Sequence, residues 1–314
     1  MGFTTGDLDD VDAGVAVARQ MKMRDAVDVN VFGAVRLDVS ADAFVARLRD
    51  IDALERRMGI RYAVKFHDPP DLAALDALSL DQSDIDSLEA CRPGDCDLQL
   101  SARDIGRFRT EVHWRGPDAK GQADRLFRQI VLERLRAYRA GGFPLLGPYN
   151  DKEDAVSPVD EFRLLSAPGD LPVELPALVH HLRGYPTSGL PGATDFFYWN
   201  KGDFGAKPTA RLNRVTIYPV SGPGIPAALR YIVATSQIYA EHYFSATLEL
   251  RSIVDDPTEP GKRSYLLYTT KSRVPGLDGF MAMLIRPIVR SRARAGMERY
   301  LGTLKKTVES SAGR

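Results

Sequence analysis

The feature of the sequence that most constrains the fold is the placement of its strand-like segments at both ends of a helical block. Apolar residues alternate with small or polar ones over residues 27–37, and the same two-residue period returns at 212–220, 229–236 and 243–253. This period is typical of half-buried strands. Residues from about 101 to 185 show helical spacing instead. Because the α/β alternation of a Rossmann-type sheet is absent, the sequence predicts an α+β protein with one antiparallel sheet and an inserted helical segment.

A long helix is predicted at the C-terminus, from about Leu277 to Glu309. Its apolar stripe, at helical spacing, is formed by Phe280, Leu284, Ile288, Met297, Leu301, Leu304 and Val308. Basic residues outnumber acidic ones along it: Arg286, Arg290, Arg292, Arg294, Arg299, Lys305 and Lys306. These cations indicate either a solvated helix face or peripheral contact with an anionic membrane surface.

The charge composition disfavours one class of binding partner, nucleic acid. The 314 residues carry 42 basic and 42 acidic side chains, and this balance disfavours nucleic acid as a partner. No apolar run approaches the roughly 18 residues of a membrane span. The N-terminal segment lacks the basic-then-apolar pattern of a secretion signal, so we expect a cytoplasmic protein unless an export signal was removed ahead of residue 1.

The two cysteines, Cys91 and Cys96, flank a Pro-Gly turn. Such a turn reverses the chain and can bring two sulfurs together, so a disulfide is one interpretation. Free buried thiols are a second, and redox or metal chemistry is a third, although a structural zinc site needs four ligands and no further cysteine exists. A disulfide would favour an oxidising compartment such as the periplasm or cell envelope.

The element order resembles the helix-grip fold of START and Bet v 1-like (SRPBCC-type) proteins, in which a curved antiparallel sheet surrounds a long C-terminal helix. Several segments are also similar to an uncharacterised family of bacterial proteins expected to be exported. They are Cys91–Asp97, Tyr198–Lys201 through Lys207-Pro208, Gln237–Phe244, and Ser272-Arg273. The resemblance implies one domain over residues 1–314, with a core of about 12–100 and 193–314 and a helical insertion of about 101–192.

The segment Gln237–Phe244 carries the densest chemistry in the chain. If the segment is extended, Tyr239, Glu241 and Tyr243 share one face and His242 lies on the other. His242 is suited to proton transfer near neutral pH, with Tyr239 or Glu241 orienting it. The segment therefore predicts a strand with a structurally bonded His, a ligand-recognition site, or an acid–base pair of His242 and Tyr239.

A second candidate group combines aromatic and basic residues. The expected ligand-binding residues are Tyr198, Trp199, Lys207, Tyr239, His242, Tyr243, Arg273, Phe280 and Leu284. Cations such as Lys207 and Arg273 could meet an acidic head group or be ordinary surface charge. The remaining His residues lack metal-like spacing and no phosphate-binding loop is present, so we expect neither a metal nor a cofactor.

The sequence thus favours a non-enzymatic protein that binds or carries a hydrophobic molecule, a lipid or sterol-like compound, between the sheet and the C-terminal helix. One alternative is an enzyme on the same fold, a cyclase or hydrolase acting on an apolar substrate through His242 and Tyr239. A second alternative is a structural or interaction protein whose groove is filled by its own side chains. The fold alone does not choose among these functions.

Overall fold

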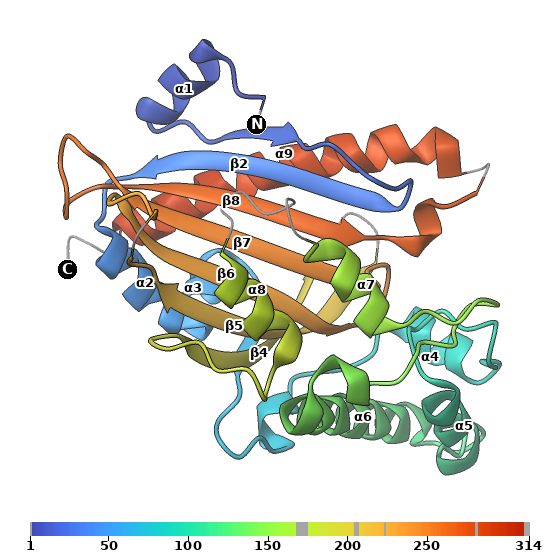
Figure 1. The fold of residues 1–314 in the computed structure, drawn as a ribbon. Helices are drawn as coiled ribbons and strands as arrows, with labels where there is room; N and C mark the ends of the chain where they lie inside the picture. The colour runs from blue at the N-terminus through green and yellow to red at the C-terminus, as the bar shows by residue number, and fades with distance from the viewer. Residues whose placement is uncertain (1, 168–174, 204–206, 223, 280–281, 311–314) are drawn as a thin grey trace.

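A curved, unclosed antiparallel sheet of eight strands organises the computed structural model, which describes residues 2–167, 175–203, 207–222, 224–279 and 282–310 (Figure 1). The strand order is β1-β2-β8-β7-β6-β5-β4-β3. The strands are β1 (Val17–Gln20), β2 (Asp28–Leu37), β3 (Tyr62–Lys65), β4 (Thr194–Asp203), β5 (Pro208–Pro219), β6 (Leu229–Ala240), β7 (Ala246–Asp255) and β8 (Ser264–Arg273). Strands from both ends of the sequence meet where β2 pairs with β8. The helical block lies between these strands in the sequence, and the protein has an α+β fold.

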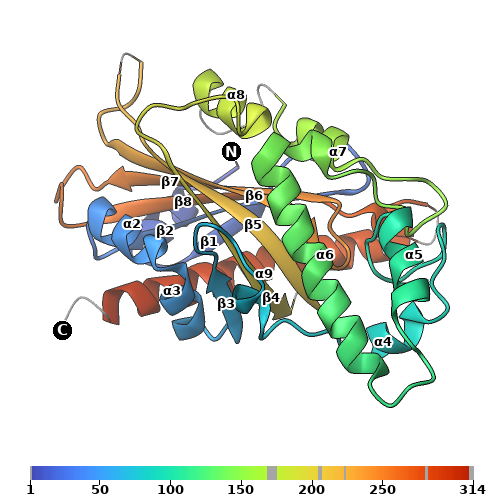
Figure 2. The same cartoon turned by 90° about the horizontal axis from the view of Figure 1, so that it is seen from below.

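Helix α9 (Ala282–Ser310) packs on one face of this sheet with α2 (Ala41–Arg49) and α3 (Ile51–Arg57) (Figures 1 and 2). The predicted C-terminal helix is therefore confirmed. Its close approach to β2 depends on Gly33, because a Cβ atom there would lie 2.7 Å from Leu301 Cδ1 and 2.9 Å from Met297 Cγ.

The apolar stripe predicted for α9 is buried only along the C-terminal part of the helix. Met297, Leu301, Leu304 and Val308 lie in the core beneath it. In the N-terminal part, the side chain of Leu284 is 70% exposed, and Met283, Ile285 and Ile288 are exposed with it. The core-facing role expected for Leu284 and Ile288 is wrong, because both side chains are exposed in the described chain. Phe280 lies outside the described residues.

The opposite face of the sheet shares a core with α4 (Gln82–Leu88) and carries helices of the inserted segment (Figure 2). These are α5 (Ala102–Glu111), α6 (Ala119–Gly141), α7 (Pro158–Leu165) and α8 (Pro176–Gly184). Apolar residues of α6, including Leu126, Phe127 and Ile130, share one core with Leu212 and Leu248 of the sheet. Sheet residues are thus buried on both faces, between two helical layers.

Shorter elements complete the chain. They are α1 (Thr5–Asp12) and three 3₁₀ turns, η1 (Ala73–Leu75), η2 (Phe143–Leu145) and η3 (Pro275–Leu277). Cys91 and Cys96 form a disulfide, which confirms the first of the three interpretations. Gly94 adopts a positive φ of 90° in the turn that the disulfide closes. Of the helices described, none is both long and apolar enough to cross a membrane.

Candidate functional site

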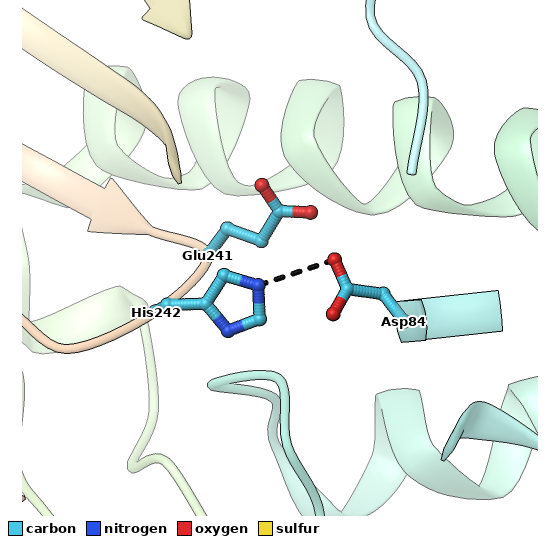
Figure 3. A group of neighbouring side chains, drawn as sticks. All are labelled: Asp84, Glu241 and His242. Atoms are coloured by element: carbon cyan, nitrogen blue, oxygen red, sulfur yellow. Dashed lines mark hydrogen bonds and ion pairs between the residues drawn. The ribbon is translucent and has the colours of Figure 1, made fainter. Parts of the chain in front are cut away.

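The chain leaves the sheet at the end of β6, within the segment where the sequence concentrates its polar groups. The extended conformation holds only as far as Ala240, and Tyr243 adopts a left-handed φ of 63°. The expected alternation of side chains beyond Ala240 is therefore wrong. Because residues 241–244 form a turn, the neighbouring side chains of Glu241 and His242 both reach toward α4 (Figure 3).

His242 is held between two oxygen acceptors. Its Nε2 lies 3.2 Å from Oδ2 of Asp84 in α4, and its Nδ1 lies 3.1 Å from the carbonyl oxygen of Asp97. Asp84 is completely buried, and His242 is 4% exposed. Burial opposes charge on the imidazole, but the Asp84 carboxylate outweighs it and raises the pKa of His242. Burial likewise opposes ionisation of Asp84, but His242 and Lys207 lower its pKa.

Glu241 provides a second buried carboxylate beside this pair. Its Oε2 accepts a 2.9 Å hydrogen bond from the Ala210 backbone nitrogen and lies 3.8 Å from Nζ of Lys201. Within the described part of the chain its Oε1 has no hydrogen-bond partner, and burial raises the pKa of Glu241 to about 7. One oxygen from each carboxylate and one ring nitrogen of His242 all lie within 4.8 Å of one another (Figure 3).

Two further predicted residues border this cluster. Lys207 Nζ lies 3.0 Å from Oδ1 of Asp84 and 3.6 Å from Oδ2 of Asp97. The hydroxyl of Tyr243 accepts a 2.8 Å hydrogen bond from the backbone nitrogen of Lys207. The structure therefore brings together Glu241, His242, Tyr243 and Lys207.

Tyr239 lies on the insertion side of the sheet and packs against Phe127 and Tyr149. The guanidinium of Arg134 sits 4.9 Å from the centre of its ring. The Tyr239 hydroxyl has no hydrogen-bond partner among the described residues, His242 included, and burial raises the pKa of Tyr239 well above the usual range. Trp199 faces the same side, where its Nε1 donates to the Ala74 carbonyl at 2.7 Å.

On the α9 side of the sheet, a network of charged and phenolic groups is buried. Nη2 of Arg251 donates to Oε2 of Glu249 at 2.9 Å, to the Tyr268 hydroxyl at 3.0 Å and to the Tyr300 hydroxyl of α9 at 3.3 Å. Tyr268 in turn donates to Glu249 at 2.7 Å. Burial opposes ionisation of Glu249, but Arg251 and Arg211 outweigh it and lower its pKa.

The network extends to α3 and β4. Glu55 of α3 accepts a 2.9 Å hydrogen bond from Nδ2 of Asn200, and burial raises the pKa of Glu55. Arg211 pairs with Oε1 of Glu249 at 3.2 Å. Tyr198 is buried on this side, where burial and the neighbouring carboxylate Glu55 raise its pKa well above the usual range.

Arg273 and the second buried imidazole lie elsewhere. Arg273 forms ion pairs with Glu161 at 2.7 Å and Asp28 at 3.0 Å, tying α7 to the sheet. His181 of α8 lies 3.2 Å from Asp195 Oδ2, and Arg214 pairs with the other oxygen of that carboxylate at 3.0 Å. The predicted ligand residues are thus distributed over both faces of the sheet, at the end of β6 and along α9.

Sequence reasoning missed Asp84, Glu249 and Arg251. Glu249 and Arg251 stand two residues apart in an apolar strand, and that spacing placed both side chains on one buried face. Asp84 gave no comparable signal, because its partners are remote in the sequence. No protein-family model matches this chain, and no curated protein matches it, so its chemistry is inferred from its own residues.

Proposed function

We propose that this chain binds an amphipathic small molecule, with an apolar body and a head group rich in hydrogen-bond acceptors, at the sheet face that carries α9. A carboxylate or carbonyl head group meets that description. The proposal keeps the hydrophobic carrier expected from the sequence and adds a polar anchor. A curved antiparallel sheet with a C-terminal helix packed on it is compatible with the START-like helix-grip arrangement, which would serve such a ligand.

The buried network around Arg251 is the observation that carries this proposal. Two guanidinium groups, Arg251 and Arg211, share the single carboxylate of Glu249. Nε of Arg251 and Nδ2 of Asn213 are buried without a hydrogen-bond partner among the described residues. Unsatisfied buried donors cost roughly 1–3 kcal/mol each, and an acceptor on a ligand would remove that cost. A charge-assisted bond from a guanidinium to a carboxylate is also stronger than a neutral one.

The same sheet face carries buried apolar side chains next to these donors. Val215, Ile217, Val233, Ile253 and Leu266 lie beside the network on β5, β6, β7 and β8. An apolar ligand body held against them would contribute about 25 cal/mol per Å² of its own apolar area removed from water. An amphipathic molecule is therefore a better match for this face than a wholly apolar one.

The exposed part of α9 supports contact with an anionic membrane surface. Met283, Leu284, Ile285 and Ile288 expose apolar side chains on the helix, and Arg292 and Arg299 are exposed on the same helix. Apolar side chains beside arginines suit the boundary between lipid tails and acidic head groups. A carrier would take up or release its ligand there, and the disulfide is compatible with an exported protein.

Native mass spectrometry followed by solvent extraction tests the proposal. We expect a stoichiometric amphipathic adduct, and binding of a fluorescent fatty acid by the stripped protein. Arg251→Lys keeps a positive charge but loses the planar fork, so fatty-acid affinity should fall about tenfold or more. Arg214→Lys, on the opposite face, is the matched control and should leave affinity unchanged.

An empty protein that also fails to bind fluorescent fatty acids and sterols would overturn the proposal and favour the interaction-protein alternative. The enzyme alternative would instead be supported by turnover of the bound compound that His242→Ala abolishes while binding is kept.

A further inference from the structure

We propose that Asp84, Glu241 and His242 bind one divalent transition-metal ion of the Zn²⁺ class. The site lies on the insertion side of the sheet, between α4 and the end of β6, away from the network around Arg251. One oxygen from each carboxylate and one ring nitrogen of the imidazole lie within 4.8 Å of one another, and Nε2 is the nitrogen that faces Asp84 (Figure 3). Nitrogen and oxygen donors of this kind suit Zn²⁺ and its first-row neighbours.

The spacing of these donors is close to what an ion needs. Ligands of a tetrahedral ion with bonds of about 2.1 Å stand roughly 3.4 Å apart. His242 Nε2 and Asp84 Oδ2 are already 3.2 Å apart. Oε1 of Glu241 belongs to a completely buried side chain and has no hydrogen-bond partner in the residues that the structure describes. A buried carboxylate oxygen that lacks a partner beside a His–Asp pair has room for one more contact, and a bound cation would supply it.

The groups around the donors orient them for an ion. The Asp97 carbonyl lies 3.1 Å from Nδ1 of His242, which places a proton on Nδ1 and leaves the Nε2 lone pair toward the site. Lys207 bonds Oδ1 of Asp84, so Oδ2 stays turned toward His242. Ala210 donates to Oε2 of Glu241 and leaves Oε1 unbonded.

The local charge also matches a divalent cation. Lys201 pairs with Glu241 and with Asp81 at 3.3 Å, while Lys207 pairs with Asp84 and with Asp97. Four carboxylates therefore share two ammonium groups, which leaves two negative charges when His242 is neutral. One divalent ion would balance them. Because the donors are buried and come from both elements, the bound ion would cross-link α4 and the end of β6.

Metal binding by the untagged, chelator-treated protein is the direct test. Titration with ZnCl₂, followed by calorimetry and elemental analysis after desalting, should give one ion per chain and raise Tm. Titration with CoCl₂ should produce the visible absorption bands of a four- or five-coordinate ion. Glu241→Gln keeps the size of the side chain and an acceptor for the Ala210 nitrogen, so it should fold and lose at least about tenfold in Zn²⁺ affinity. His242→Gln should lose at least as much.

His181→Gln is the matched control, because His181 is also a buried imidazole paired with a carboxylate, Asp195, and is outside the Asp84 cluster. It should leave Zn²⁺ affinity unchanged. The proposal is overturned if the parent protein binds no ion at roughly 100 μM Zn²⁺. It is equally overturned if Glu241→Gln binds as well as the parent, or if His181→Gln loses binding to the same degree.

Discussion

His242 and Asp84 are 158 positions apart in the sequence, yet Nε2 of the first lies 3.2 Å from Oδ2 of the second in a fully buried pair. Removing one partner of a buried ion pair leaves the other uncompensated, at a cost of about 3–5 kcal/mol. We therefore expect Asp84→Asn to lower the free energy of unfolding by that amount in chelator-containing buffer.

A double-mutant cycle measures the pairing itself. Asp84→Asn and His242→Gln, measured singly and together by urea unfolding, should show a coupling free energy of about 1 kcal/mol or more. Asp84→Asn combined with Glu249→Gln is the control, because Glu249 lies in the network under α9, and those effects should add. Additive effects for the Asp84–His242 pair would contradict a direct interaction.

The raised pKa of Glu55 predicts that the free energy of unfolding changes with pH. Burial raises its pKa above the ordinary 4.5, so the folded protein holds a proton that the unfolded chain has released. Its contribution to stability is present at low pH and is lost as pH rises from 4.5 through the raised pKa. Glu55→Gln keeps an acceptor for Asn200 and does not titrate. Relative to the parent, it should gain stability in urea unfolding as pH rises above 4.5. A difference that stays constant with pH would exclude this role.

The disulfide closes a loop with a sequence separation of only 5. The chain-entropy estimate for so short a loop is about 2 kcal/mol, so Cys91→Ala with Cys96→Ala should lower the free energy of unfolding by about that much. Because Asp97 follows Cys96 directly, the same variant should also loosen the carbonyl that faces His242. Urea unfolding of the parent with and without reductant provides the comparison. An unchanged unfolding midpoint in both experiments would show that the turn is stable without its disulfide.

The packing of α9 on β2 depends on the missing side chain at Gly33. Gly33→Ala places a methyl group within 3 Å of Leu301 and Met297, and such overpacking costs typically about 1–3 kcal/mol. Gly302→Ala is the control, since a Cβ there meets nothing within 4 Å and alanine favours helix, so it should be neutral or stabilising. Thermal unfolding distinguishes the two. Equal Tm values for both variants would mean that α9 shifts easily on the sheet.

Membrane contact is predicted for the exposed part of α9. Flotation with phosphatidylglycerol vesicles should recover the parent protein, and Leu284→Glu with Ile288→Glu should reduce partitioning at least about tenfold. Leu145→Glu changes a similarly exposed side chain on the insertion side and should have no effect. Failure of the parent to float, or equal flotation of the double variant, would remove α9 as the contact surface.

The spacing of apolar residues was sufficient to predict the helices and strands whose burial follows a local sequence pattern. The alternation in residues 27–37 predicted β2, and the stripe of Met297, Leu301 and Leu304 predicted α9. It was less accurate at the end of β6, where the left-handed Tyr243 turns the chain and no glycine or proline marks the turn. The contact of Asp84 with His242 could not be predicted, because it depends on where α4 packs against the sheet. The sequence also did not distinguish Leu284, which is exposed, from Leu301, which is buried at the same spacing.

The unclosed sheet has a consequence for the behaviour of the protein at high concentration. Its two outermost strands, β1 and β3, are four residues each, whereas the six between them have ten to twelve. An open sheet edge can pair with a strand of another chain, and this tendency to associate grows with the length of unpaired backbone. Here β1 pairs with residues 31–34 of β2 and β3 with residues 198–201 of β4, so the middle of each long outer strand is covered, and the two outermost strands carry the charged side chains Arg19 and Lys65. The strand order thus limits intermolecular β-association without a closed barrel.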